Sequence, residues 1–206
     1  MRLWTIQSIF AYERMLQTGM LTANNQRYLS DHDFLRAYAW MSMKMIESKI
    51  YPPSNGIEYP VWAWYQWEGK KKRLNMRKGG YAKRGDKMVQ LTVEAEMKNA
   101  LLSDFDLFHY VLNYMYLPLD EKDDKIFEKE YESAGYSWSD LSNTLIENEV
   151  MLSLRDKIEK SWDRIFDLSK EDNGWLYGKL DNKTIQATLW QIRLEQVKKA
   201  EIFIAK

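Results

Sequence analysis

The sequence predicts an α+β fold, in which one domain over residues 1–206 holds a small mixed or antiparallel sheet with flanking helices. Apolar and polar residues alternate at 2–7, 58–68 and 87–96, which indicates strands. Apolar residues recur at helical spacing at 8–19 and 33–50, which indicates helices. These elements do not alternate regularly, and there is no G-x-G-x-x-G or P-loop, so a doubly wound sheet is disfavoured.

The first half of the chain carries clear helix ends and one aromatic strand. Ile9, Tyr12, Met15 and Leu16 form the apolar stripe of the first helix, and Gly19 is a suitable C-cap. In the second helix the stripe comprises Phe34, Ala37, Tyr38, Met41, Met45 and Ile46, with Asp31 or Asp33 as the N-cap and Pro52 beyond its end. In the strand at 58–68, Val61 and Ala63 face one way and Trp62 and Trp64 face the other. The two tryptophans either fill the core or line a cleft.

Charges are segregated along the chain, although the net charge is zero. Residues 70–87 hold nine Lys or Arg and one Asp, and are expected to form a long loop. This loop is either a plain solvated loop or a surface that meets phosphate groups. Residues 120–132 hold seven acidic residues and three Lys.

The segment 101–113, "LLSDFDLFHYVLN", mixes polar side chains with leucines and aromatics. We expect Ser103 and Asp104 to start a helix that runs to about Tyr116. Asp106, His109 and Asn113 would then share one face as a polar ridge that is either solvated or turned into a cleft. Further helical spacing predicts a long helical region at 137–169 with apolar positions at Leu141, Leu145, Val150, Leu152, Leu154, Ile158, Trp162 and Ile165. Strands are expected at 184–193 and 201–205, joined by a polar turn around 195–199.

Several classes of site and location are disfavoured by composition. The chain has no Cys and only two His, so disulfides and a Cys nucleophile are excluded and a histidine-based zinc site is not expected. No run approaches the roughly 20 apolar residues of a membrane span. The beginning of the sequence lacks the apolar region of a signal peptide, so we expect a cytoplasmic protein that contacts no membrane.

Four stretches carry a family resemblance: "RLWTIQ", "YPVWAWYQW", "LLSDFDLFHYVLN" and "IQATLWQI". Together they resemble an uncharacterised bacterial family, the domain of unknown function 3841. The resemblance covers most of the chain, and "LLSDFD" followed by "HYVLN" is its most specific part. The family name implies no activity.

A second resemblance is to ADP-ribosyltransferase-like domains, in the spacing of "LWTIQ" and "MLQTGML" and in the later strands "YPVWAW" and "IQATLW". It implies an NAD cofactor, with Thr5 and Gln7 on the first strand of a cleft and Gln186 nearest to the catalytic Glu of those domains. An amide there cannot offer a full charge to a cationic centre, which favours weak or absent transferase activity. Glu147, Glu149 and Glu195 are the alternative carboxylates.

Two functions from different classes follow. The first is an NAD-binding domain in which Trp62 or Trp64 stacks on a flat ring, the cations Arg77, Lys78 and Arg84 meet the pyrophosphate, and His109, held by Asp106, carries a proton or donates a hydrogen bond. The second is a module without catalysis that binds nucleic acid or protein through the basic, aromatic-flanked segment 62–87. The zero net charge disfavours a dedicated nucleic-acid binder.

Overall fold

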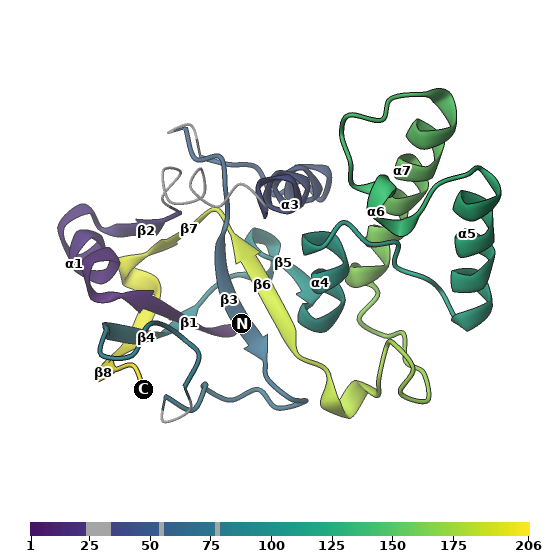
Figure 1. Ribbon diagram of the computed structural model, residues 1–206. Helices are drawn as coiled ribbons and strands as arrows, with labels where there is room; N and C mark the ends of the chain where they lie inside the picture. The colour runs from purple at the N-terminus through teal and green to yellow at the C-terminus, as the bar shows by residue number, and fades with distance from the viewer. Residues whose placement is uncertain (24–33, 54–55, 77–78) are drawn as a thin grey trace. The chain divides into compact units, whose positions relative to one another are not determined.

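The computed structural model describes residues 1–23, 34–53, 56–76 and 79–206, and it confirms the α+β class (Figure 1). The chain divides into two compact units. The first unit comprises residues 1–102 and 184–206, and the second unit comprises residues 103–183. The expectation of a single domain stays a prediction.

The main sheet has six strands in the order β5-β6-β3-β1-β4-β8. The pairings of β1 with β3 and β4, of β3 with β6 and of β4 with β8 are antiparallel. A second sheet pairs the short strands β2 and β7. The strands are β1 (Arg2–Ser8), β2 (Met20–Thr22), β3 (Val61–Gln66), β4 (Lys87–Glu94), β5 (Leu101–Asp104), β6 (Ile185–Leu189), β7 (Gln191–Arg193) and β8 (Val197–Ile204).

The helix α1 (Ile9–Thr18) packs against one face of the main sheet through Met15, which is fully buried in a cluster with Leu3 and Leu91. The Ser8 hydroxyl accepts a hydrogen bond from the Ala11 N–H and caps the helix, and Gly19 ends it in the left-handed conformation at φ 78°. The predicted cap at Gly19 is therefore confirmed. Leu16 is half exposed, because the face of α1 that meets the sheet centres on Met15.

The helix α3 (Leu35–Glu47) buries Ala37, Trp40, Met41 and Met45, as its spacing predicts for three of these four. Ile46 is exposed, contrary to the expectation, because Met45 already occupies the buried face one residue earlier. The candidate caps Asp31 and Asp33 lie outside the described residues. The indole N–H of Trp190 donates to the Ile50 carbonyl oxygen just after the helix.

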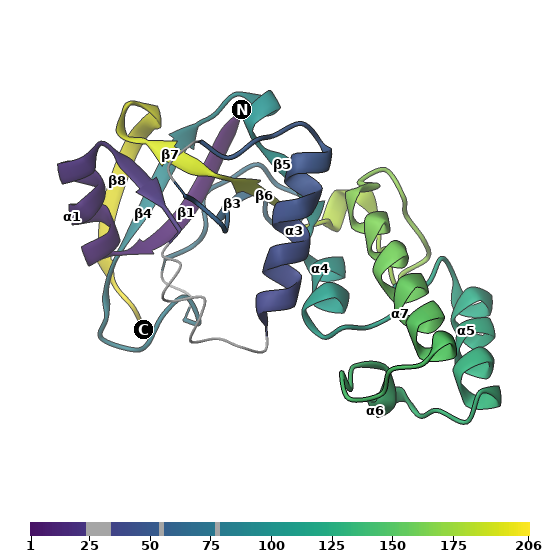
Figure 2. The same cartoon turned by 90° about the horizontal axis from the view of Figure 1, so that it is seen from above.

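The second unit is helical, and α5 and α7 run side by side within it (Figure 2). Its core includes Phe127 of α5, Leu154 and Ile158 of α7, and Trp162 directly after α7. The helices are α4 (Phe105–Leu112), α5 (Glu121–Ser133), α6 (Trp138–Leu141) and α7 (Glu149–Ser161). Short 3-10 helices occur at Met97–Asn99, Trp162–Phe166, Leu180–Asn182 and Leu194–Gln196.

The predicted helical region at 137–169 and the last predicted strand differ from the structure. The helical region at 137–169 is interrupted between α6 and α7, where Leu145 is 90% exposed, and Val150 and Leu152 are exposed as well. The interruption follows from Asn148, whose side chain accepts the Met151 N–H and starts a new helix. Near the end of the chain, β8 is longer than the expected strand at 201–205, since pairing with β4 already begins at Val197.

Candidate functional site

A cleft of about 920 Å³ opens in the first unit where β1 and β3 separate. The register pairs these strands only at Trp4 and Trp64, whereas β1 and β4 pair along the whole of β1. Figure 1 shows β1 running away from β3 toward α1. Residues 5–8 and 61–64 line the cleft from the two diverging strands. A broken strand pairing thus creates a cleft beside the core of this sheet.

The structure brings five of the predicted site residues together around this cleft. They come from the three neighbouring strands β1, β3 and β6, whose register places Trp64 opposite Gln186. The five residues are Thr5, Gln7, Trp62, Trp64 and Gln186. The helices α1 and α3 add Phe10, Ala11, Arg14, Thr18 and Tyr38 to the lining.

The hydroxyl of Thr5 links the two separating strands. It donates to the Trp62 carbonyl oxygen at 2.8 Å and accepts from the Gln7 side-chain amide at 2.7 Å. Thr5 is only 2% exposed, so this hydroxyl mainly fixes the cleft wall. Within the described part of the chain the Gln7 carboxamide oxygen has no hydrogen-bond partner, and it is therefore the polar atom of β1 that is best suited to meet a ligand.

Trp62 and Trp64 line the cleft, which answers the question that their alternation leaves open. Both are partly exposed, while Val61 and Ala63 on the opposite face are buried in the core. The ring of Trp62 lies 5.9 Å from that of Tyr38, and the ring of Trp64 lies 4.9 Å from that of Trp67 in an edge-on contact. Aromatic neighbours fix both indoles in place, so each can present a rigid surface to a flat ligand.

The charge of the lining is positive. Arg14 of α1 is exposed and is the one charged side chain among the described residues of the lining, and none of these residues is acidic. Gln186 is 4% exposed on β6. The alternative carboxylates do not line the cleft: Glu195 follows β7 at another concavity of the first unit, and Glu147 and Glu149 belong to the second unit. The cleft therefore offers an amide and a guanidinium, and no described carboxylate.

The basic loop contributes less to the cleft than expected. Gly80 and Tyr81 line it, but Arg84 is exposed and does not. Arg77 and Lys78 lie outside the described residues. The Tyr81 hydroxyl donates to the Asn75 carbonyl oxygen, and burial, followed by the charge of Glu68, raises the pKa of this phenol. Tyr81 is thus a neutral hydrogen-bonding group at neutral pH.

His109 and Asp106 lie on α4 in the second unit and are not among the residues that line the cleft. Both are exposed, as is Asn113, so the polar ridge is a solvated face. The His109 ring nitrogen Nδ1 lies 3.1 Å from the Phe105 carbonyl oxygen, and the Asn113 amide donates to the His109 carbonyl oxygen at 2.7 Å. Although the Asp106 residue is exposed, partial desolvation of its carboxyl, followed by the charge of Asp104, raises the pKa of that group. The His109 and Asn113 side chains bond to their own helix.

The start of α4 differs from the expectation in one residue and adds an unexpected ion pair. Ser103 is not the cap, because residues 101–104 form β5 and the Asp104 carboxylate accepts the N–H groups of Asp106 and Leu107. The other oxygen of Asp104 accepts from the Lys183 ammonium at 2.7 Å, with both side chains 3% exposed. The sequence separation of this pair hides it from pattern analysis.

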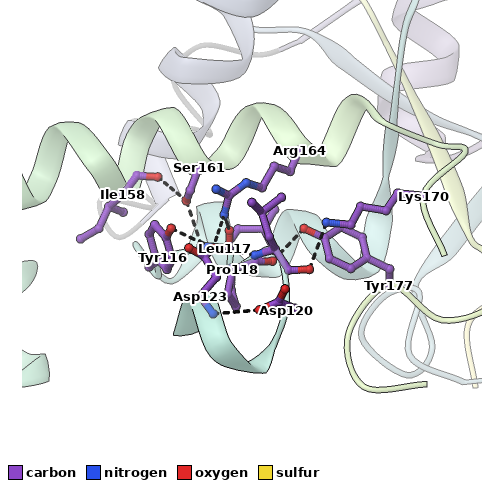
Figure 3. Close-up of polar contacts among 11 residues, drawn as sticks. Tyr116, Leu117, Pro118, Asp120, Asp123, Ile158, Ser161, Arg164, Lys170 and Tyr177 are labelled. Atoms are coloured by element: carbon purple, nitrogen blue, oxygen red, sulfur yellow. Dashed lines mark hydrogen bonds and ion pairs between the residues drawn. The ribbon is translucent and has the colours of Figure 1, made fainter. Parts of the chain in front are cut away.

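A second polar cluster of the second unit holds the segment between α4 and α5 (Figure 3). Arg164 donates to the Leu117 carbonyl oxygen and to the Asp123 carboxylate, and the Tyr177 hydroxyl donates to the Pro118 carbonyl oxygen at 2.8 Å. The Lys170 ammonium donates to the Leu119 carbonyl oxygen and lies 3.9 Å from the centre of the Tyr177 ring. Because each polar group meets a main-chain oxygen or a carboxylate, the cluster is structural.

No helix in the described ranges is long and apolar enough to cross a membrane.

Comparisons with known proteins place the chain in a family. No curated protein and no solved structure was found to match the chain. The likeness to ADP-ribosyltransferase-like domains therefore stays a prediction. The family model for a domain of unknown function, DUF3841, matches residues 2–198. Since this match spans nearly the whole sequence, the chain belongs to the DUF3841 family.

Proposed function

We propose that the cleft between β1 and β3 binds a nucleotide, with NAD as the first candidate. The observation that carries this proposal is the convergence of two partly exposed indoles, a carboxamide oxygen and one guanidinium on a cleft without a described carboxylate. Its volume of about 920 Å³ lies within the usual range for ligand sites. Trp62 or Trp64 would stack on a base or nicotinamide ring, Gln7 would accept a hydrogen bond, and Arg14 would meet phosphate oxygens.

The same lining argues for binding rather than efficient group transfer. Breaking the glycosidic bond of NAD builds positive charge on the ribose, which a carboxylate stabilises far better than an amide. Gln186 supplies only an amide, and the carboxylates Glu195, Glu147 and Glu149 do not line the cleft. We therefore propose a nucleotide-binding domain with little or no transferase activity.

The test is thermal unfolding of the full chain with and without millimolar NAD. A ligand at 100 times its dissociation constant adds about 2.7 kcal/mol, which shifts the midpoint of a chain of this size by roughly 5–10 °C. Arg14→Met removes the only described cation of the lining and should abolish most of that shift. Its matched control is Arg2→Met on β1, because Arg2 makes only an exposed ion pair with Glu94 and does not line the cleft.

The two variants also separate binding from general charge effects. An unchanged NAD shift in Arg2→Met together with a lost shift in Arg14→Met supports the cleft. Equal loss in both variants points to unspecific attraction and would refute the site. The absence of any shift with the unmodified chain would refute nucleotide binding itself.

A further inference from the structure

The zero net charge of the chain conceals a division between its two units. The first unit holds twenty Lys and Arg against eleven Asp and Glu, a net charge of +9. The second unit holds ten Lys and Arg against nineteen Asp and Glu, a net charge of −9. A unit with this excess of cations attracts anions over its surface, whatever the total charge of the chain.

Part of this positive charge gathers on one surface, because β8 lies beside the basic loop. The Gly85 N–H donates to the Ala205 carbonyl oxygen, and the Ala205 N–H donates to the Asp86 carbonyl oxygen, both at 2.9 Å. Within β8, Glu201 accepts from Arg73 at 2.5 Å and from Lys199 at 3.0 Å. In both views the C-terminus lies where β8 ends (Figures 1 and 2).

These contacts define a basic surface, by which we mean Lys71, Lys72, Arg73, Lys83, Arg84 and Lys199. All six residues are exposed. The surface follows β8 from Lys199, which pairs with Thr92, to Ala205, which contacts Gly85, a span of roughly 20 Å. Glu201 and Asp86 are the acidic residues on the segments that carry it, and Glu201 is already held by two cations. An extended run of exposed cations matches the repeated phosphates of a polymer.

Aromatic rings lie next to these cations. The Lys71 ammonium sits 4.5 Å from the centre of the Tyr65 ring. Trp67 and Lys70 exchange two backbone hydrogen bonds, which turns the chain so that the basic segment begins beside the indole. Tyr65 and Trp67 are both partly exposed. Rings beside a basic track offer stacking positions for unpaired bases, and an intact duplex cannot use them.

We propose that this basic surface binds single-stranded nucleic acid, with the six cations on the phosphates and the neighbouring rings on the bases. The site is distinct from the nucleotide cleft, because none of the six cations lines that cleft. It also extends beyond the basic segment of the sequence, since it includes Lys199 of β8. The inference does not rest on the proposed NAD site.

The experiment measures the binding of the full chain to a labelled oligothymidine by fluorescence anisotropy. The test variant combines Lys72→Glu, Lys83→Glu and Arg84→Glu. The control combines Lys122→Glu, Lys129→Glu and Lys179→Glu, three exposed lysines of the second unit, so that both variants change the net charge equally. Duplex DNA of the same length and inorganic polyphosphate serve as competitors.

We expect the test variant to weaken binding at least tenfold and the control to weaken it by less than about threefold. Each lost phosphate contact should reduce the salt slope of binding by about 0.7, so three should reduce it by about 2. The test variant should keep its thermal shift with NAD, which separates this inference from the cleft. If the triple variant fails to fold, Lys83→Gln with Arg84→Gln replaces it.

Three results would overturn the inference. The first is the absence of binding by the unmodified chain at low salt. The second is an equal loss in the two triple variants, since the site would then not lie on the basic surface. The third is competition by polyphosphate or duplex as strong as that by oligothymidine, which would show attraction to charge without recognition of unpaired bases.

Discussion

At the scale of single residues, polar side chains in apolar surroundings are matched by partners that lie far away in the sequence. Asp104 illustrates this, because one carboxylate oxygen caps α4 and the other accepts from Lys183, 79 residues later. Such a carboxylate is tolerated when buried only because both of its oxygens are engaged. The unusual polar content of the segment 101–113 therefore has two causes, namely a buried ion pair at its start and a solvated helix face after it.

Removing the ammonium of this pair should be costly. Lys183→Met leaves the Asp104 carboxylate buried without its counter-charge, so we expect the free energy of unfolding to fall by about 3–5 kcal/mol. Urea unfolding followed by circular dichroism measures this loss. The control Lys125→Met breaks an exposed, solvent-screened pair with Glu121 and should leave the free energy of unfolding nearly unchanged. Equal losses in the two variants would contradict the assigned role of the buried pair.

Tyr177 should make the stability of the protein depend on alkaline pH. Burial, the largest cause, raises the pKa of its phenol to about 12, above its ordinary value of 10.0. Between these values the unfolded chain loses this proton while the folded chain keeps it, so stability falls as pH rises from 10 to 12. Tyr177→Phe should flatten part of this fall. Thermal midpoints of both proteins across this pH range provide the measurement, and identical slopes would refute the effect.

At the scale of elements, periodicity predicted the strands at β1, β3 and β4 and the helices α1 and α3, because each presents apolar residues to the core at the spacing of its element. It did not predict α5, where charged residues outnumber the two buried aromatics Phe127 and Tyr131. It also joined α6 and α7, since exposed residues such as Leu145 resemble core positions in sequence. Apolar character alone does not show which side chains are buried in the core.

The sequence pattern likewise predicted only part of the cleft. Alternation separated Trp62 and Trp64 from the core face of β3, and the structure places both on the cleft. What the sequence did not reveal is the separation of β1 from β3, because strand pairing depends on contacts across the whole sheet. Arg14 was missed for the same reason, since an exposed arginine on a helix gives no signal until the neighbouring strands are placed.

The cap at Asn148 should be essential for the start of α7. Its side-chain oxygen accepts the Met151 N–H at 2.9 Å, and its amide donates to the Tyr136 hydroxyl at 2.7 Å. Asn148→Ala removes both bonds, and we expect a loss of about 1–2 kcal/mol in the free energy of unfolding. Asn173→Ala, at an exposed position, is the control. Urea midpoints that decrease equally would show that the cap has no special role.

At the scale of the whole molecule, the total charge is a poor guide to function. The net charges of +9 and −9 cancel in the sum, yet the first unit carries both the proposed nucleotide-binding cleft and the basic surface. Only the division into units, which depends on three-dimensional contacts, makes this asymmetry visible. The zero net charge therefore does not weigh against an anionic ligand for the first unit.

A calorimetric titration of NAD into the full chain tests directly whether the cleft between β1 and β3 binds a nucleotide, as we propose. We expect one site per chain, a negative heat-capacity change from burial of the rings, and at least tenfold weaker binding in Arg14→Met than in Arg2→Met. An absence of heat at millimolar NAD, or equal affinities in the two variants, would show that the cleft is not a nucleotide site.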